Sequence, residues 1–404
     1  MKRLQRKEYL DKLLALRKKQ IIKVITGVRR CGKSTLLEIM QDELRSMGVQ
    51  EKQIIAINFE DYENKELRNP DILYSHIVSR LSNSGTTYIF LDEIQHVNNF
   101  ADVVNAIFIK PNVDLYITGS NAFMLSSEIA TLLSGRYLEI NLLPLSYSEY
   151  IESSGNENDL NRKYINYITN SSFPYTTEIQ DNPTIVNDYL QGIYNTIILK
   201  DVMQRRSFRD VMMLESIVAF VMDNIGNTLS SKKIADTMTS SGRKIDVKTV
   251  EKYLSALQES FIIYKAGRYN IKGRQLLKTM KKYYLVDVAL RQVILGRQGV
   301  DLGHLLENIV YLELLRRNQH VFIGKSDNLE IDFVTINGQD ISYYQVAATV
   351  RDENTLRREL TPLQNIRDNH PKWLLTLDDD PDINLQGIRK VNVLQWLLHK
   401  NKPT

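Results

Sequence analysis

The stretch IIKVITGVRRCGKSTLLEIM, residues 21–40, decides the fold of the first part of the chain. Its centre, GVRRCGKS at residues 27–34, matches the P-loop pattern G-x-x-x-x-G-K-[ST], between a β-branched strand and a helical pattern. The two glycines let the loop wrap so that backbone N–H groups point at phosphate oxygens. Lys33 is suited to neutralise β- and γ-phosphate charge, and the Ser34 hydroxyl to ligate Mg²⁺. We expect a nucleotide to contact Gly27, Val28, Arg29, Arg30, Cys31, Gly32, Lys33, Ser34 and Thr35.

A second motif, YIFLDE at residues 88–93, ends an apolar strand in two carboxylates. We expect Asp92 to hold Mg²⁺ through its water shell, and Glu93 to orient and polarise the attacking water. On its own, an acidic strand end is common in proteins. Together with the P-loop it predicts hydrolysis of a nucleoside triphosphate, with Lys33 and Glu93 as catalytic groups.

Two further positions have more than one interpretation. In TGSNA, residues 118–122, a polar side chain such as Asn121 either senses the γ-phosphate and holds the water, or caps a helix after the strand. Arg136 in LSGRY is a candidate arginine finger that acts from a neighbouring subunit, with a structural or surface role as the alternative. For Arg29 and Arg30 a solvated role is favoured over phosphate contact.

Strand and helix signals alternate around these motifs, which predicts an α/β fold with a parallel sheet between helices. The strands are expected at residues 21–27, 53–61, 87–93, 113–120 and 136–142. Pro144 and the polar stretch after it end this core. We therefore divide the chain into a P-loop core at 1–158, a helical region at 159–227, a winged-helix-like unit at 228–282 and an α/β domain at 283–404.

The third segment has a helix–turn–helix pattern. SSKKIADTM and DVKTVEKYLSALQES predict two helices, FIIYKAGRYN a β-hairpin wing, and IKGRQLLKTMKKYY a basic connector. Basic side chains in such a unit contact DNA phosphates, which gives salt-dependent binding with little sequence information. The alternative is a module that packs inside the protein or docks another protein. The candidates for DNA contact are Arg243, Lys244, Lys248, Thr249, Lys252, Tyr253, Arg268 and Tyr269.

The last segment places the strands LEIDFVTI and ISYYQVAAT after the helix LGHLLENIVYLELLRR. This order resembles the restriction-endonuclease-like fold, in which an Asp and a later (Asp/Glu)-x-Lys hold a metal and stabilise charge. Asp332 and Glu307 match, but Gln345 and Ala347 stand where the second carboxylate and the lysine belong. Glu330 is a substitute ligand, although neighbours on a strand point to opposite faces. The departure predicts a nuclease-like shell without nuclease activity.

GVRRCGKSTLL, FLDEIQ, TGSNAFML, LSGRY and LPLSYSEY together resemble one group of prokaryotic AAA-type P-loop ATPases, over essentially the whole chain. In that group a C-terminal domain of poorly defined function follows the ATPase. The resemblance implies ATP as the nucleotide, and a five-stranded sheet whose glutamate-bearing strand lies beside a P-loop strand that is not adjacent in the chain. Lys33, Ser34, Asp92 and Glu93 stand at matching positions.

The composition is that of a globular protein, with 43% hydrophobic and 25% charged residues, which excludes disordered and collagen-like classes. A net charge of +4 permits nucleic acid binding without requiring it. Cys31 is the one cysteine, so no intramolecular disulfide forms. The charged N-terminus lacks the apolar region of a signal peptide, and no apolar run approaches the roughly 20 residues of a membrane span. A cytoplasmic protein without a membrane partner is expected.

These features lead to one main hypothesis and two alternatives. The main hypothesis is a Mg²⁺-dependent ATPase that drives or gates the C-terminal units, with DNA, further copies of itself or another protein as partners. The first alternative is a DNA-binding protein whose conformation is set by ATP, with negligible turnover. The second is an ATP-gated nuclease, against which the missing lysine argues.

Overall fold

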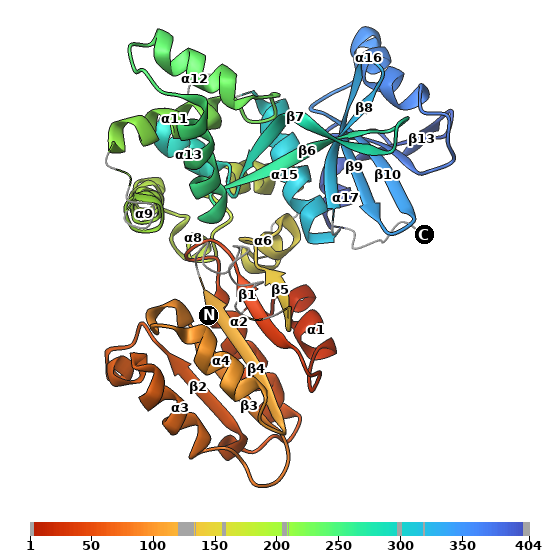
Figure 1. Cartoon of the computed structure of the whole chain (residues 1–404). Coiled ribbons are helices and arrows are strands. Elements are labelled where there is room, and N and C mark those ends of the chain that lie inside the picture. The colour runs from red at the N-terminus through yellow and green to blue at the C-terminus, as the bar shows by residue number, and fades with distance from the viewer. Residues whose placement is uncertain are drawn as a thin grey trace. The chain divides into compact units, whose positions relative to one another are not determined.

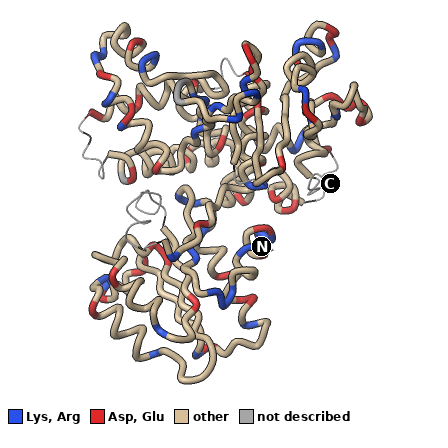
Figure 2. The backbone as a smooth tube through the Cα atoms, turned by 45° about the vertical axis from the view of Figure 1, so that its right-hand side comes forward, with Lys and Arg blue, Asp and Glu red and all other residues tan. Residues whose placement is uncertain are grey.

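The computed structural model of the chain describes residues 4–119, 133, 135–155, 159–203, 208, 210–296, 301–317 and 320–398. Two units are distinguished in it. The first comprises Met1–Pro144 and Glu259–Phe261, and the second comprises Leu145–Gln258 and Ile262–Thr404. Basic and acidic residues are interspersed along the backbone of both units (Figure 2). Over the described residues, no helix combines the length and the apolar character that crossing a membrane requires.

Five parallel strands form the sheet of the first unit, as the sequence predicts (Figure 1). They are β1 at Ile22–Thr26, β2 at Ile54–Asn58, β3 at Thr87–Asp92, β4 at Val113–Gly119 and β5 at Tyr137–Asn141. Their order across the sheet is β2-β3-β4-β1-β5. β4 therefore lies between the strand that leads to the glutamate and the P-loop strand, and the expectation that those two strands are neighbours is wrong.

Two pairs of helices flank this sheet. α1 at Lys7–Ala15 packs beside α2 at Lys33–Ser46, and α3 at Pro70–Val78 packs beside α4 at Phe100–Phe108. β1 and β3 are buried along their whole length. Parallel strands between helical layers have no face toward water, which is why both read as continuous apolar runs.

The second unit begins with helices. They are α6 at Tyr147–Ser153, α7 at Leu160–Asn170, α8 at Thr176–Ile179, α9 at Pro183–Thr196 with a π-helical continuation at Ile197–Met203, α11 at Val211–Asp223, α12 at Ser231–Ser240 and α13 at Val247–Glu259. Local signals set where they start. The Asn182 side chain caps α9 ahead of Pro183, and the Asp246 carboxylate accepts the Thr249 N–H at 2.9 Å in the first turn of α13.

An eight-stranded mixed sheet completes the second unit (Figure 1). Its strands are β6 at Ile263–Asn270, β7 at Gln275–Leu285, β8 at His320–Ser326, β9 at Leu329–Asn337, β10 at Asp340–Ala347, β11 at Lys372–Thr376, β12 at Ile383–Leu385 and β13 at Ile388–Asn392. Their order is β12-β13-β11-β10-β9-β8-β6-β7. The accompanying helices are α14 at Ala289–Leu295, α15 at Leu302–Arg317, α16 at Glu353–Gln364 and α17 at Val393–Leu398.

The β6–β7 hairpin corrects two sequence predictions. The stretch FIIYKAGRYN, expected to form a whole hairpin, supplies only β6, and the expected basic connector supplies its antiparallel partner β7. β6 also pairs in parallel with β8, where Arg268 is opposite Ile323. The hairpin that follows the three helices α11, α12 and α13 therefore belongs to the C-terminal sheet as well.

β8, β9 and β10 form an antiparallel meander, and β11 runs parallel to β10. α15 precedes this meander in the chain, and α16 connects β10 to β11. The apolar core of this part joins α16 to the sheet through residues such as Ile331, Leu363 and Leu374. The resulting chain order, one helix, three strands, one helix and one strand, brings the predicted Asp332 and Gln345 onto adjacent strands.

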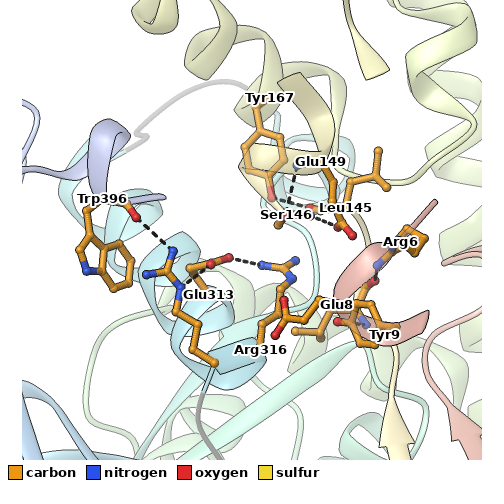
Figure 3. A network of polar contacts seen from close by, with 12 residues as sticks. Arg6, Glu8, Tyr9, Leu145, Ser146, Glu149, Tyr167, Glu313, Arg316 and Trp396 are labelled. Carbon is orange, nitrogen blue, oxygen red and sulfur yellow. Dashed lines mark hydrogen bonds and ion pairs between the residues drawn. The ribbon is translucent and has the colours of Figure 1, made fainter. Parts of the chain in front are cut away.

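A charged network ties α15 to α17 (Figure 3). The Glu313 carboxylate accepts hydrogen bonds from Arg316 Nη1 at 3.1 Å and from Arg317 Nε at 2.6 Å. Arg317 Nη2 in turn donates to the Trp396 carbonyl oxygen at 3.0 Å, and its guanidinium lies over the Trp396 ring. Glu313 is thus paired with two arginines within the second unit, which fits a structural role.

Candidate functional site

The P-loop joins the end of β1 to the start of α2, and its glycines meet tight constraints. Gly27 has a φ of 148°, and a Cβ atom there would lie 2.3 Å from the carbonyl oxygen of Leu142. Gly32 has a φ of 102° and immediately precedes the first residue of α2. A loop of backbone N–H groups that runs into a helix N-terminus favours anions, because both present positive charge.

The Lys33 side chain lies back across this loop and is buried, with 4% of its surface exposed. Its Nζ donates to the carbonyl oxygens of Gly27 at 3.2 Å and Val28 at 3.3 Å. The same ammonium lies 3.7 Å from Oε1 of Glu93. The predicted phosphate-binding lysine and the predicted base therefore meet at the carboxyl edge of the sheet.

Thr118, at the end of β4, joins the two acidic residues. Its hydroxyl donates to Oδ1 of Asp92 and accepts the backbone N–H of Glu93 at 2.9 Å. Asp92 is buried, and burial raises its pKa, while hydrogen bonds from the Thr118 and Ser34 hydroxyls counteract part of that rise. Asp92 and Ser34, the two predicted Mg²⁺ ligands, are thus brought together, and the intervening strand supplies the residue that fixes them.

Glu93 has a backbone φ of 55°, in the left-handed region that residues other than glycine rarely adopt. Its carboxylate accepts a hydrogen bond from the side-chain amide of Gln95. Strained backbone of this kind is held by its surroundings, and it aims one side chain away from the strand direction. Here that direction is toward Lys33.

The remaining predicted residues of the loop divide by exposure. Val28 and Cys31 are fully buried, and burial raises the pKa of the Cys31 thiol, which favours its neutral form. Arg29 lies 3.7 Å from the Glu60 carboxylate, and Arg30 and Thr35 are exposed.

Arg136, the finger candidate, is among the described residues, whereas Asn121, the sensor candidate, is not. Arg136 is exposed just before β5, and its backbone carbonyl accepts the Ile22 N–H at 2.9 Å. Asn121 and Ser120 lie outside the described residues. Of the segment TGSNA, the structure describes Thr118 and Gly119, so the sensor role of Asn121 stays a prediction.

Arg6 is a residue of this site that the sequence analysis missed. It is buried, with a backbone φ of 47°, and Nη1 donates to the Cys31 carbonyl oxygen at 3.1 Å. Nη2 donates to the carbonyl oxygen of Leu143 at 2.6 Å. Arg6 thus links the P-loop backbone to the segment that leaves β5. Its basic surroundings at the start of the chain gave no signal that set it apart from solvated neighbours.

Comparisons with known proteins identify this arrangement. Residues 19–151, which hold the loop and all five strands, match the AAA domain family, and residues 161–301 match a domain of unknown function, DUF8612. An uncharacterized protein of Haemophilus influenzae is 37% identical over 399 residues, which cover 98% of each chain. The chain carries an AAA domain and belongs to one family with this Haemophilus influenzae protein.

An archaeal protein and a solved structure are also similar to this chain. The uncharacterized protein MJ1544 of Methanocaldococcus jannaschii is 31% identical to this AAA-type chain over 355 residues, 83% of this chain and 76% of that one. The structure of the Walker-type ATPase PABY2304 of Pyrococcus abyssi aligns with a TM-score of 0.50 at 15% identity, over 72% of this chain and 95% of that chain. At that identity, the likeness shows a shared fold alone.

The candidates for DNA contact in this AAA-type chain are only partly at the surface. Lys244, Lys248 and Lys252 are exposed along the turn and the first half of α13. Tyr253 is buried and stacks on Phe208 with 4.3 Å between ring centroids, so the prediction that it faces DNA is wrong.

The other candidates of that segment are engaged within the protein. Arg243 Nη1 donates to the Met212 carbonyl oxygen at 2.6 Å, and the Thr249 hydroxyl donates to the capping Asp246. At the hairpin, Arg268 lies 3.7 Å from Glu330, and Tyr269 packs against Phe322 of β8. These contacts argue against the DNA-facing role predicted for Arg268 and Tyr269. Among the predicted candidates, Lys244, Lys248 and Lys252 remain exposed to a partner.

The C-terminal candidates do come together. Asp332 Oδ2 accepts the Val346 N–H at 2.8 Å, and the Asp332 N–H approaches Oε1 of Gln345 at 3.4 Å. The argument that Glu330 points to the opposite face from Asp332 is wrong. The two residues are two positions apart on β9, so both point to the same face. Both carboxylates approach a lysine of β7 that the sequence analysis left in the basic connector, Lys282.

Proposed function

We propose that this chain is a Mg²⁺-dependent ATPase that works as a switch or motor for its C-terminal units. The observation that carries this proposal is the hydrogen-bonded set of Asp92, Thr118 and Glu93, which faces Lys33 at the end of the P-loop. Membership of the AAA-type family favours ATP as the nucleotide. We further propose the division into a core at 1–158, a helical region at 159–227, a winged-helix-like unit at 228–282 and a nuclease-like domain at 283–404.

Binding would begin at the loop. Phosphate oxygens would replace the Gly27 and Val28 carbonyls as partners of the Lys33 ammonium, because a full negative charge attracts it more strongly than a carbonyl dipole. Oxygen ligands are what Mg²⁺ prefers, and the Ser34 hydroxyl and the buried Asp92 carboxylate fit it. When bound, the ion would neutralise charge on the β- and γ-phosphates.

Hydrolysis would follow by in-line attack of water on the γ-phosphate, which releases ADP and phosphate. Glu93 is placed to orient that water, since its backbone N–H is held by Thr118 and its carboxylate is adjacent to Lys33. The hydrogen bond from Gln95 would have to yield as the Glu93 carboxylate turns to the water. Catalysis would come mainly from positioning and charge stabilisation.

Two roles are proposed around this centre. Arg136 would act as a finger on the phosphate of a neighbouring copy, a role for which its exposure is suited. Asn121 would hold the water or sense the γ-phosphate. A homo-oligomer is the assembly that these roles require.

Phosphate release by the purified chain tests the proposal. Turnover is expected for the wild type with ATP and Mg²⁺, none for Lys33→Ala, and none for Glu93→Gln, which should still bind ATP. A Lys52→Ala variant, at an exposed lysine of the first unit, serves as the matched control. Phosphate release by Glu93→Gln at the wild-type rate would show that the base is assigned wrongly.

A DNA-binding function is the second candidate, supported by the exposed Lys244, Lys248 and Lys252. α11, α12 and α13 precede the β6–β7 hairpin, and Leu229 forms a single antiparallel bridge with Lys281, an order that fits a winged helix. In filter binding of duplex DNA, Lys248→Ala/Lys252→Ala should weaken binding and reduce the salt slope by about two. Equal binding by this variant and by Lys52→Ala would reject the candidate.

A further inference from the structure

A lysine from β7 lies among three carboxylates of the C-terminal domain, Glu307, Glu330 and Asp332. We call this cluster the carboxylate pocket. The Lys282 side chain is 5% exposed, and its Nζ lies 3.0 Å from Oε1 of Glu307, 3.0 Å from Oε1 of Glu330 and 3.9 Å from Oδ1 of Asp332. The three carboxylates come from α15 and β9. The ammonium is therefore the common partner of all three.

Two of these carboxylate oxygens have further donors within the protein. Oε1 of Glu307 also accepts the Tyr284 hydroxyl at 2.6 Å, and Oδ2 of Asp332 is occupied by the Val346 N–H at 2.8 Å. Tyr284 and Lys282 are two residues apart on β7, so one face of this strand supplies both donors to Glu307.

Gln345 stands where the endonuclease-like fold implies a second carboxylate, and its side chain is bonded to another residue. Gln345 uses its side-chain amide to donate to Oε2 of Glu359 on α16 at 2.8 Å. Oε1 of Glu359 is bound by the Arg358 guanidinium at 2.8 Å and 3.0 Å. The Glu359 carboxylate beside Gln345 is therefore held by partners of its own.

These residues do not fit the metal that such a fold implies. A divalent ion in a nuclease site takes several oxygen ligands, whereas here a fixed positive charge stands among them. Within the described part of the chain, no group of three or more histidine, cysteine or acidic side chains has the arrangement of a metal site. The pocket resembles the fold's metal site in its carboxylates and departs from it in its cation.

Charge balance explains why the buried Lys282 side chain remains protonated. Burial alone would lower the pKa of Lys282, but Glu307, Asp332 and Glu330 together raise it above the ordinary value, so the ammonium remains charged. Burial, together with the nearby Glu307 charge, raises the pKa of Asp332 to about 8. Without the ammonium, Glu307 and Asp332 would repel each other in a buried site, and the Arg268 guanidinium would remain at Glu330, 3.7 Å away.

We propose that the Lys282 ammonium is the resident cation of this pocket, in place of a divalent metal, and that it makes the C-terminal domain a metal-free unit without hydrolytic activity. The lysine also fastens β7 to α15 and β9. The hairpin that follows α13 is thereby joined to the C-terminal domain by charge as well as by strand pairing. This proposal stands on the second unit alone and does not depend on ATP hydrolysis.

The test removes the ammonium and asks for a metal in its place. Lys282→Met keeps the length and apolar stem of the side chain but removes the cation that Glu307, Glu330 and Asp332 share. With the full chain and Mn²⁺ as the probe, in the absence of nucleotide, equilibrium dialysis should show one Mn²⁺ gained per chain. Asp332→Asn in the same background should weaken that binding roughly tenfold or more. Lys282→Arg, which keeps the positive charge, should gain none.

Two binding results would overturn the proposal. One is Mn²⁺ binding by the wild type that Asp332→Asn abolishes, because the pocket would then accept a metal beside its lysine. The other is a folded Lys282→Met chain that binds no more Mn²⁺ than the wild type. Should Lys282→Met unfold in metal-free buffer, the proposal requires millimolar Mn²⁺ to restore its circular dichroism while Lys282→Arg folds without it. Failure of Mn²⁺ to do so contradicts the proposal.

Discussion

Replacing Thr118 by valine tests how the acidic end of β3 is held. The hydroxyl is fully buried and makes two hydrogen bonds, one to Asp92 and one from the Glu93 N–H. A hydrogen bond to a charged group contributes about 1.5–3 kcal/mol, and a buried N–H left without a partner costs about 1–3 kcal/mol. Because these effects share one side chain they do not simply add, and we expect the free energy of unfolding to fall by about 2–5 kcal/mol.

The same substitution should impair turnover. The hydrogen bond from Thr118 holds down the pKa of Asp92, so its loss favours the protonated carboxyl, which is a poor Mg²⁺ ligand. Urea denaturation and phosphate release at saturating ATP measure the two effects. Thr118→Ser is the matched control, since it keeps the hydroxyl and loses one buried methyl, worth about 1 kcal/mol. If Thr118→Val unfolds and turns over like Thr118→Ser, the reasoning is refuted.

Three further predictions concern other contacts. Gly27→Ala should destabilise the chain and abolish ATP binding, because its Cβ would lie 2.3 Å from the Leu142 carbonyl oxygen; normal ATP affinity by calorimetry would contradict this. Arg6→Ala should lower the free energy of unfolding by about 1.5–3 kcal/mol and weaken ATP binding, since the Cys31 carbonyl loses its guanidinium; a loss of stability with unchanged ATP affinity would limit Arg6 to a structural role. Asp332 should make stability depend on pH. Its pKa is raised to about 8 from 3.8, so in that window the unfolded chain has lost a proton that the folded chain keeps. The stability of the wild type relative to Asp332→Asn should therefore fall as pH rises through this window. Urea denaturation that gives the same stability difference between the two proteins at every pH would contradict this.

The nucleotide site was predictable because its chemistry is local in the chain. A strand, a glycine-rich loop with Lys33 and the first turns of a helix lie within residues 21–40, and Asp92 and Glu93 end an apolar run. Each of these signals is a short pattern with a physical requirement behind it. The order of the strands depends on contacts between segments far apart in the chain. The apolar runs of the strands look alike, so the position of β4 between β1 and β3 could not be predicted from them.

Long-range partners account for the other differences. Arg6 and Lys282 lie in stretches rich in basic residues, where the sequence alone does not tell a buried cation from a solvated one. In the connector, the basic content masked the strand β7, whose last four residues, 282–285, are buried. Tyr253 is a different case, since it continues the apolar spacing of Val250 and Leu257 on α13, and this periodicity predicts burial.

The most direct measurement of the central claim is a crystal structure with a non-hydrolysable ATP analogue and Mg²⁺. Our account predicts that Lys33 Nζ leaves the carbonyl oxygens of Gly27 and Val28 and contacts the β- and γ-phosphates. Ser34 and Asp92 should lie at the Mg²⁺, with Glu93 facing the γ-phosphate. An analogue bound away from residues 27–34, or a Lys33 that keeps its 3.2 Å contact with Gly27 while the analogue is bound, would contradict the account.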